Sequence, residues 1–337
     1  MRFLRTVFKC ALGIIAAQPV WAACPFDRID SGFTGPMASV PSFANLAFPA
    51  VLFRSGLEID FDGAPNAYHK GNIDESVDPG FDHICNGGTV LEFKNGRLVD
   101  KYGSGGSVGK LGGIDPNTGI GRSKLCKLDY IALRDKGFPS CSSSQNCMLF
   151  YGIKVQARAC GYENPFGGPN DMRCGVPILQ RDDKGELRDF YLTTTAYRRP
   201  NANSDSLKQS DYVDAAKIPY IVMPGGQKLP GNIPYEQGDI AVVVRGKHIA
   251  YAIIGDAGPS KKIGEASAAL LWQLDTKGPV EFTRTPATMT ILFPGTRKLL
   301  KKEWPVDPNE IKRKARTLLG ELGVDDLRAC EGLERLQ

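Results

Sequence analysis

Histidine is scarce in this sequence, and its scarcity disfavours two common kinds of active site. The three histidines, His69, His83 and His248, are far apart and form no pair with the spacing of a zinc-binding helix. No nucleophile-elbow sequence is present to place a serine or a cysteine beside one of them. Acid–base chemistry in this chain therefore falls to carboxylates.

A long apolar run is also missing beyond the N-terminal segment. No such stretch approaches the ~18 apolar residues of a membrane-spanning helix. The N-terminus has basic residues ahead of the apolar stretch 10–17, which predicts a secretory signal peptide cleaved after Ala22. A lipid-anchor signal ending at Cys24 is the alternative, although Trp21 stands where such signals carry a branched aliphatic residue. We therefore expect an exported protein, periplasmic or extracellular, with no transmembrane segment.

Neither sign of charge dominates the chain. The formal charge is +5, and removal of residues 1–22 takes away three cations and leaves +2. This small excess gives no electrostatic reason to expect a nucleic-acid partner.

The chain lacks any Cys-x-x-Cys pair, although eight cysteines remain after the signal peptide. The spacing argues against zinc, and export favours disulfides. Cys141 and Cys147 enclose a short serine-rich loop, while Cys160 and Cys174 enclose one rich in proline and glycine, so we predict these two bridges. The remaining four cysteines are expected to pair among themselves: Cys24, Cys85, Cys126 and Cys330.

Apolar runs bounded by turn residues predict a mostly β protein. The strongest local signal is Asn95-Gly96, which is typical of a tight hairpin turn. Seven or so strands around one helix indicate a barrel or a sandwich. The expected strands cover residues 50–61, 90–93, 98–99, 148–155, 190–197, 220–223, 240–244, 249–254, 280–284 and 288–293.

The last forty residues change character. Asp307-Pro308 predicts the start of a helix, and Glu310 is placed to close a capping box. Apolar residues then follow at helical spacing from Ile311 to Leu322, which indicates that one face packs on the body of the protein. We expect a signal peptide at 1–22, one domain at 23–300 with a cysteine-rich insertion at about 120–180, and a C-terminal helical segment at 301–337.

Residues 238–274 contain the best candidates for catalysis. Two buried strands lead to Gly255-Asp256-Ala257-Gly258-Pro259, which places Asp256 at a strand end. Nine residues later Glu265 precedes a run of good helix formers, so we expect it in the first turn of a helix. The intervening glycines and proline favour a loop that folds back and turns both carboxylates toward one cleft, as an acid–base pair requires.

Two further pairs of polar residues lie on expected strands. Asp60 and Asp62 are two apart and so share one face of a strand. Thr194 and Thr195 either donate to a sugar or line the pleat of a sheet.

Four blocks of this sequence resemble chitosanases of glycoside hydrolase family 75. They are AVLFRSGLEIDFDGAPNAYH from residue 50, FYLTTT from 190, VDAAKIPYIVMP from 213 and GDAGPSKKIGEAS from 255, and the likeness extends over about 48–72 and 188–305. It implies that Asp256 and Glu265 are the essential carboxylates. The residues that it implies contact the substrate are Asp60, Asp62, Tyr68, Thr194 and Thr195.

The Asp-x-Gly-Pro segment also resembles the active-site edge of double-psi β-barrels in peptidoglycan lytic enzymes and expansin-like proteins. That likeness implies a six-stranded double-psi β-barrel-like core, and it introduces peptidoglycan as a rival substrate. The cysteines lead us to expect long disulfide-pinned loops around this core. One departure from the chitosanase pattern is Thr193-Thr194-Thr195-Ala196, where the family usually has Ser-Thr-Thr-Ser.

Together the residues and the resemblance lead us to expect a secreted glycoside hydrolase that cleaves β-1,4 linkages in an amino-sugar polymer. Chitosan is the first choice, and a muramidase or lytic enzyme acting on peptidoglycan is the alternative. The resemblance implies an inverting mechanism, for which we assign Glu265 as the acid and Asp256 as the base. A non-catalytic wall-polysaccharide-binding module is the contrasting class. We expect a monomer without metal or cofactor.

Overall fold

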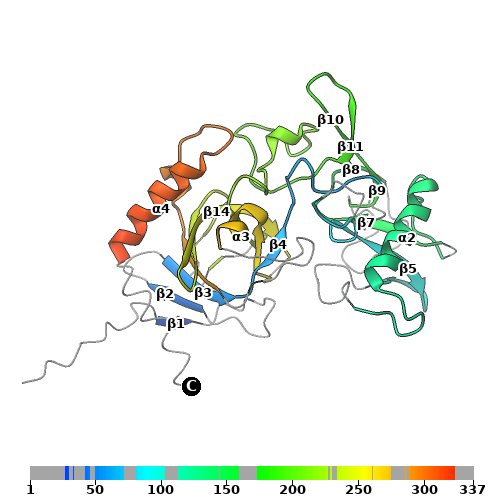
Figure 1. The fold of residues 1–337 in the computed structure, drawn as a ribbon, viewed down its shortest axis with the longest axis horizontal. Coiled ribbons are helices and arrows are strands. Elements are labelled where there is room, and N and C mark those ends of the chain that lie inside the picture. Colours follow the sequence, from blue (N-terminus) through cyan, green and yellow to red (C-terminus); the bar gives the residue numbers. More distant parts are fainter. Residues whose placement is uncertain are drawn as a thin grey trace, which may run out of the picture.

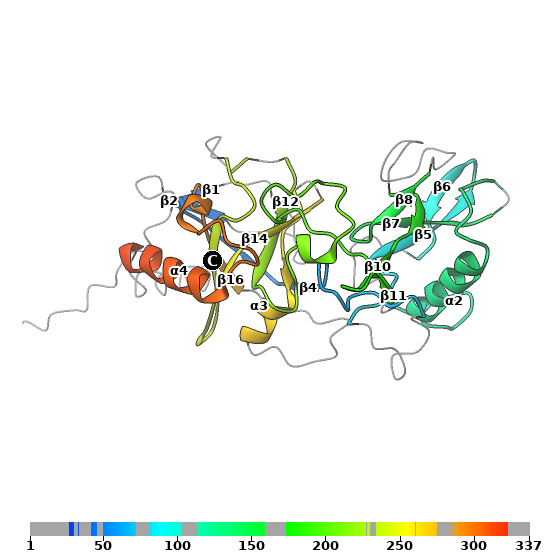
Figure 2. The ribbon, with the colours of Figure 1, turned by 90° about the horizontal axis from the view of Figure 1, so that it is seen from above.

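The computed structural model consists of two lobes that lie side by side (Figures 1 and 2). The large lobe comprises residues 27–62 and 212–322, the small lobe comprises residues 81–177, and residues 178–211 run between them. The signal peptide, Cys24, Cys160, Cys330 and the strand expected at 280–284 lie outside the described residues. The structure describes residues 27–29, 33, 42–45, 50–71, 81–102, 113–143, 145–158, 173–226, 228–229, 234–259, 261–274, 285 and 288–322.

The large lobe is built on a sheet of nine described strands. In sheet order they are β1 (Asp27–Ile29), β2 (Ser42–Asn45), β3 (Ala50–Ser55), β16 (Thr288–Phe293), β13 (Ile240–Arg245), β14 (His248–Gly258), β12 (Tyr220–Pro224), β15 (Glu265–Ser267) and β4 (Glu58–Asp60). β12 pairs with β14, and β15 with β4, in parallel; the other neighbours are antiparallel.

The single strand expected over 50–61 is two strands in the structure. β3 and β4 are separated by Gly56-Leu57 and lie far apart in the order of the sheet. The sequence concealed this break, because apolar residues continue in alternation from β3 through Leu57, Ile59 and Phe61.

The hairpin predicted at 240–254 is confirmed as β13 and β14, whose residues pair from Ile240–Ile253 to Arg245–His248. Side chains alternate across a strand, so Val242 joins the apolar cluster on one face of the sheet and Val243 the cluster on the other. Both faces are buried, which explains why these strands read as continuous apolar runs.

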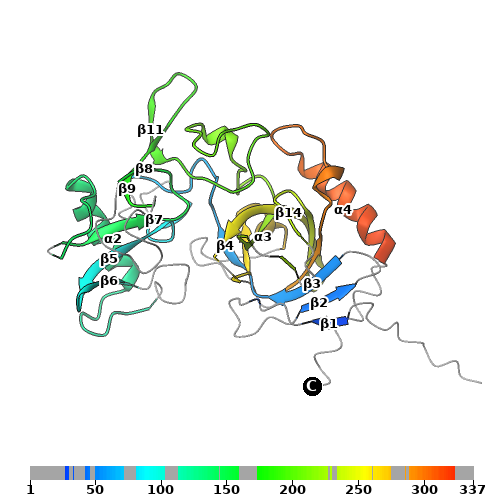
Figure 3. The ribbon, with the colours of Figure 1, turned by 180° about the vertical axis from the view of Figure 1, so that it is seen from behind.

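Two helices cover the two faces of this sheet. α3 (Ala268–Gln273) contributes Leu270 and Leu271 to one cluster, and strands are seen around it in Figures 1 and 3. α4 (Pro308–Leu322) contributes Ile311 and Ala315 to the other. The layers therefore run helix, sheet, helix, with the sheet curved around α3.

The predicted C-terminal helix is confirmed. Asp307 Oδ1 accepts a hydrogen bond from the backbone N–H of Asn309 at 2.9 Å, and Pro308 is the first helical residue. Glu310 differs from the expected capping box, because its carboxylate accepts from the N–H of Lys301 at 3.3 Å and so ties the helix to the preceding loop.

The small lobe has its own sheet of three described strands, in the order β6 (Arg97–Asp100), β5 (Gly88–Lys94) and β7 (Cys147–Phe150). The predicted turn at Asn95-Gly96 is confirmed, with φ of 53° and 79°. A second pair, β8 (Val155–Ala157) and β9 (Gly175–Pro177), extends the lobe. The strand expected at 148–155 is thus two short strands, β7 and β8.

Helix α2 (Arg122–Asp135) packs on this sheet and was not predicted. The sequence led us to expect long loops pinned by disulfides here, whereas the described residues form a folded lobe. Cys85 on the loop before β5 bonds to Cys126 of α2, and the predicted bridge between Cys141 and Cys147 is confirmed. Cys174 is also disulfide-bonded, as predicted.

Between the lobes, β10 (Leu179–Arg181) and β11 (Leu187–Tyr191) form a projecting hairpin (Figure 3). The strand expected at 190–197 ends at Tyr191, because the chain then turns toward the large lobe through Ala196. Short 3-10 turns follow at η1 (Gln209–Asp211) and η4 (Arg297–Leu299). The prediction of a mostly β protein with a few helices is confirmed, and no helix in the described part of the chain could span a membrane.

Candidate active site

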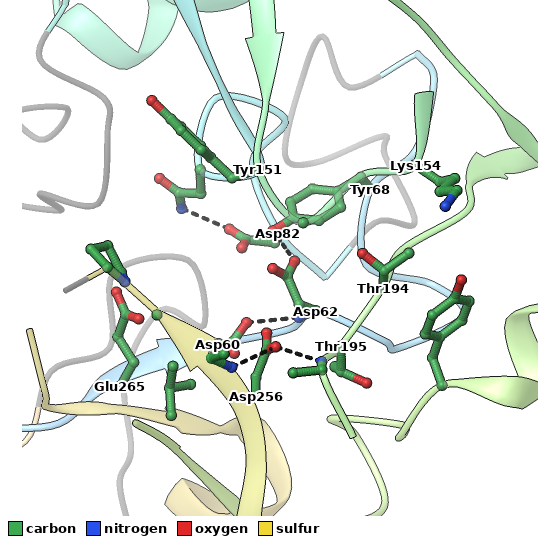
Figure 4. A pocket seen from close by; sticks show the side chains of 18 of the residues that line it. Asp60, Asp62, Tyr68, Asp82, Tyr151, Lys154, Thr194, Thr195, Asp256 and Glu265 are labelled. Atoms are coloured by element: carbon green, nitrogen blue, oxygen red, sulfur yellow. Dashed lines mark hydrogen bonds between the residues drawn. The ribbon is translucent and has the colours of Figure 1, made fainter. Parts of the chain in front are cut away.

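A cleft of about 750 Å³ lies between the two lobes. Residues of β4, the end of β14 and β15 form one wall, and residues of the small lobe form the other (Figure 4). Every side chain that the sequence nominated for catalysis or substrate contact lines this cleft: Asp60, Asp62, Tyr68, Thr194, Thr195, Asp256 and Glu265. The folded-back loop expected between Asp256 and Glu265 thus brings both to one cavity.

Asp256 lies two residues before the end of β14, where the strand runs parallel to β12. Its Oδ1 atom accepts hydrogen bonds from the backbone N–H groups of Ala196 at 2.7 Å and Ala257 at 2.8 Å. Burial raises the pKa of Asp256 well above its ordinary value, and the negative charge of Asp60 raises it further, against the two N–H donors. This carboxyl is therefore held in one orientation and is prone to carry a proton.

Asp60 is the last residue of β4 and lies beside Asp256 (Figure 4). Its Oδ1 atom accepts from the N–H of Asp62 at 2.8 Å, and its Oδ2 atom accepts from the Tyr220 hydroxyl at 3.1 Å. Burial raises the pKa of Asp60 to about 6, and the charge of Glu265 adds to this rise. Asp60 thus takes up a proton just below neutral pH.

Asp62 connects the two lobes. The Tyr68 hydroxyl donates to its Oδ1 atom at 2.9 Å, and burial, followed by the charges of Asp60 and Asp256, raises its pKa well above the ordinary value. The backbone of Gly152 in the small lobe presses on this carboxyl, since a Cβ atom at Gly152 would lie 1.8 Å from Asp62 Oδ2. Only glycine fits there.

Asp82 is a fourth aspartate of the cleft and comes from the small lobe. Its Oδ1 atom accepts from the Asn86 side chain and from the N–H of His83, both at 2.7 Å. Burial raises its pKa to about 7. No motif surrounds Asp82, and it lies twenty residues beyond Asp62 along the chain, so it could not be predicted from the sequence. The cleft residues that we had not predicted include Glu58, Asp82, Asn86, Tyr151, Lys154, Arg173, Arg198 and Lys262.

Glu265 occupies a different setting from the one predicted. It begins β15 rather than a helix, because residues 265–267 pair with β12 and β4 before α3 begins at Ala268. The helix cap is Ser267, whose Oγ accepts from the N–H of Leu270 at 3.2 Å. The Glu265 carboxylate forms an ion pair with Lys262, and its side chain is 23% exposed to the cleft.

The two threonines have different roles. The hydroxyl of buried Thr195 donates to the carbonyl of Tyr197 at 2.8 Å and accepts from the N–H of Val213 at 3.1 Å, so it fixes the loop. Thr194 is only partly buried and lies on the cleft wall, and its backbone N–H donates to the carbonyl oxygen of Gly152 at 2.8 Å (Figure 4). Thr194 is therefore the one better placed to meet a substrate.

A buried serine–histidine contact in the small lobe does not form a nucleophile. His83 Nδ1 accepts from the N–H of Cys85 at 3.0 Å, so Nε2 carries the proton and donates to Ser123 Oγ at 2.7 Å. Burial lowers the pKa of His83 to about 3, which keeps the ring neutral. This histidine cannot take a proton from Ser123. Within the described ranges, no group of three or more His, Cys, Asp or Glu side chains is arranged to hold a metal ion.

No protein-family model matches the chain, and no curated protein matches its sequence. Function is therefore inferred from the cleft and from the four sequence blocks that supply most of its carboxylates.

Proposed function

We propose that this protein is an exported glycoside hydrolase that cleaves β-1,4 linkages in an amino-sugar polymer, with chitosan as its first substrate. The observation that carries the proposal is the contrast between Asp256 and Glu265 in one cleft. Asp256 has a raised pKa, whereas Glu265 is ion-paired with Lys262. Two carboxyl groups whose environments favour different protonation states are what acid–base cleavage of a glycosidic bond requires.

The electrostatics support roles opposite to those that we assigned from the sequence. Asp256 is the acid, because its raised pKa keeps a proton that can pass to the leaving glycosidic oxygen. Glu265 is the base, because its ionised carboxylate, open to the cleft, can take a proton from the attacking water. Attack by water from the side opposite the leaving group gives a product with inverted anomeric configuration.

The acidic floor of the cleft supports a cationic substrate. Asp60, Asp62, Asp82 and Asp256 line one cavity, although the mature chain as a whole is slightly basic. Like charges this close raise one another's pKa, and an amino-sugar ammonium placed among them would relieve that repulsion. A local acidic surface of this kind also attracts a polycation to the cleft.

We further propose that the core of the large lobe is a six-stranded double-psi β-barrel-like unit. Two parallel pairs, β12 with β14 and β15 with β4, within an otherwise antiparallel sheet support this relationship. Val222 of β12 pairs with Asp256 of β14 on one side and with Glu265 of β15 on the other, so these two carboxyl groups lie at the same level of the sheet.

The test is to incubate the mature protein separately with chitosan, chitin and purified peptidoglycan, and to identify products by mass. We expect the wild type to release oligomers from chitosan and the Asp256→Asn variant to release none. NMR spectra recorded early in the reaction should show products with inverted anomeric configuration. Muropeptides from peptidoglycan alone would establish the rival substrate instead. Binding to any of the three polymers without new chain ends would show a polysaccharide-binding module.

A further inference from the structure

We infer that Lys262 is a positioning residue for Glu265, and that Glu58 anchors Lys262 from the opposite side. This inference rests on the proposed function, because it concerns the carboxylate that activates water. Neither Lys262 nor Glu58 belongs to the residues that the sequence nominated.

The pairing of two strands creates the need for a cation at this point. β15 runs parallel to β4 with Glu265 and Glu58 as register partners, and the N–H of Glu58 donates to the carbonyl of Gly264 at 2.7 Å. Two glutamates on neighbouring strands repel each other unless a positive charge lies between them. Without that positive charge, the pairing of β15 with β4 would be destabilised at Glu265 itself.

Lys262 supplies that charge. Its ammonium contacts Glu265 Oε1 and lies 3.6 Å from Glu58 Oε2. The loop 261–264 folds back so that this lysine, three residues before Glu265, reaches both carboxylates. Burial alone would lower the pKa of Lys262, but the charge and hydrogen bond of Glu265, with those of Glu58, raise it above its ordinary value. The lysine therefore stays protonated.

The three side chains differ in exposure, and this difference assigns their roles. Glu58 is 5% exposed and Lys262 is 21% exposed, whereas Glu265 is 23% exposed and opens on the cleft. The buried glutamate fixes the ammonium from behind, and the ammonium fixes one oxygen of Glu265. Its other oxygen, Oε2, faces the space beside Gly258.

The other titratable groups that face Glu265 are negative. Asp60 comes from β4 and Asp256 from the end of β14, and the charge of Glu265 raises the pKa of both. Without Lys262, Glu265 would lie among Glu58, Asp60 and Asp256 and would lose the ammonium that contacts its Oε1 atom. It would then take up a proton at higher pH and turn away from its position.

The experiment compares Lys262→Met, Lys262→Arg and, as a control, Lys247→Met, which changes an exposed lysine at the turn between β13 and β14. For Lys262→Met we expect kcat on chitosan to fall at least tenfold at neutral pH with a small change in KM, and the acidic limb of the pH–rate profile to move up by about one pH unit or more. Lys262→Arg should restore much of the rate. The control should match the wild type.

A second variant separates positioning from simple support of the fold. In Glu58→Gln/Lys262→Met one of the repelling charges is gone, so the acidic limb should move back toward that of the wild type. If Lys262→Met loses stability but keeps the wild-type pH–rate profile, the lysine only joins the strands and the inference is wrong.

A readout that needs no activity distinguishes failure of this inference from failure of the proposed function. Chemical denaturation should show that Lys262→Met is less stable than the wild type at pH 8 and that the gap narrows toward pH 4, as the uncompensated glutamates take up protons. A stability difference that stays constant with pH would show that Lys262 does not act through the charges of Glu58 and Glu265. If the wild type cleaves no polymer, the proposed function fails. A pH-dependent stability difference would then show that Lys262 stabilises the pairing of β15 with β4 without a catalytic role. That outcome also overturns the inference.

Discussion

The two lobes share one cleft but are stabilised in different ways. The large lobe buries both faces of its sheet under α3 and α4, and its strands are rich in valine, isoleucine and leucine. The small lobe has a narrower sheet and one helix, and both disulfides between described cysteines lie in it. A small unit buries less apolar surface for each residue that it orders, so covalent links compensate.

The lobes also differ in what they give the cleft. The large lobe supplies Asp60, Asp256 and Glu265 from strand ends, where pairing fixes the backbone. The small lobe supplies Asp82, Tyr151 and Lys154 from loops near β5 and β7. Under the proposed function, the large lobe would carry the chemistry and the small lobe would shape the substrate path.

The largest effect is expected at the two proposed catalytic residues of the large lobe, Asp256 and Glu265. Asp256→Asn and Glu265→Gln should each lower kcat by about 10²–10⁴-fold, because each removes a proton donor or acceptor from the transition state. Asp82→Asn should mainly raise KM for chitosan. Steady-state kinetics measures all three. An equal loss of kcat in Asp82→Asn would refute the division of roles between the lobes.

The next largest effect concerns the covalent links. Replacing Cys85 and Cys126 by alanine opens a loop of 41 residues and should cost about 4 kcal/mol of stability. Removing Cys141 and Cys147, only 6 apart, should cost about 2 kcal/mol. Hydrogen exchange measured at increasing urea concentrations should show that these variants lose protection in the small lobe and keep it in the large lobe. Equal loss of protection in β13 and β14 would show that the lobes unfold as one unit.

Gly152→Ala tests the junction between the lobes. The added methyl group would overlap the Asp62 carboxyl and must push the small lobe away from it, at a cost of about 1–3 kcal/mol. Gly96→Ala, at a turn with open space, is the control for loss of glycine alone. Wild-type stability and KM in Gly152→Ala would mean that the lobes do not meet at this contact.

The last prediction concerns the dependence of stability on pH, where the change expected for each pH unit is small. Burial raises the pKa of Asp60 to about 6 and that of Asp82 to about 7, both above the unfolded value of 3.8. The stability from each group is full below pH 3.8 and is lost as pH rises through the folded pKa. The free energy of unfolding should therefore fall between about pH 4 and pH 7, by at most about 1.4 kcal/mol per pH unit for each group. Asp82→Asn should flatten this slope near neutral pH; an unchanged slope would show that Asp82 does not titrate there.

The sequence predicted much of the large lobe because its signals are local and strong. Apolar runs located β12, β13, β14 and β16, and Asp307-Pro308 located the start of α4. It did not predict that residues 50–61 form two strands, since only pairing with distant partners separates β3 from β4. It also placed Glu265 in a helix, because Ala266 and its neighbours favour helix until strand pairing overrides that preference.

The small lobe was harder to predict. Helix α2 carries Lys, Arg and Asp on most of its surface, and few of its residues are buried, so its periodicity is weak. Asp82 and Lys262 reach the cleft through tertiary contacts that leave no mark in the local sequence. A residue of the candidate site was therefore predictable where a sequence motif surrounds it, as at Asp256. It was not predictable where only the tertiary fold places it in the cleft, as at Asp82.

The order of the strands has a consequence for how the chain folds. β3 and β4 pair with β16 and β15, whose residues follow them by more than two hundred positions, whereas β5 and β6 are joined by a two-residue turn. Local contacts form fast, and pairings between distant segments form slowly because closing a long loop costs entropy. The small lobe can therefore fold while β3 and β4 still lack β16 and β15, which leaves the apolar strand β3 exposed to aggregation until the last part of the chain arrives.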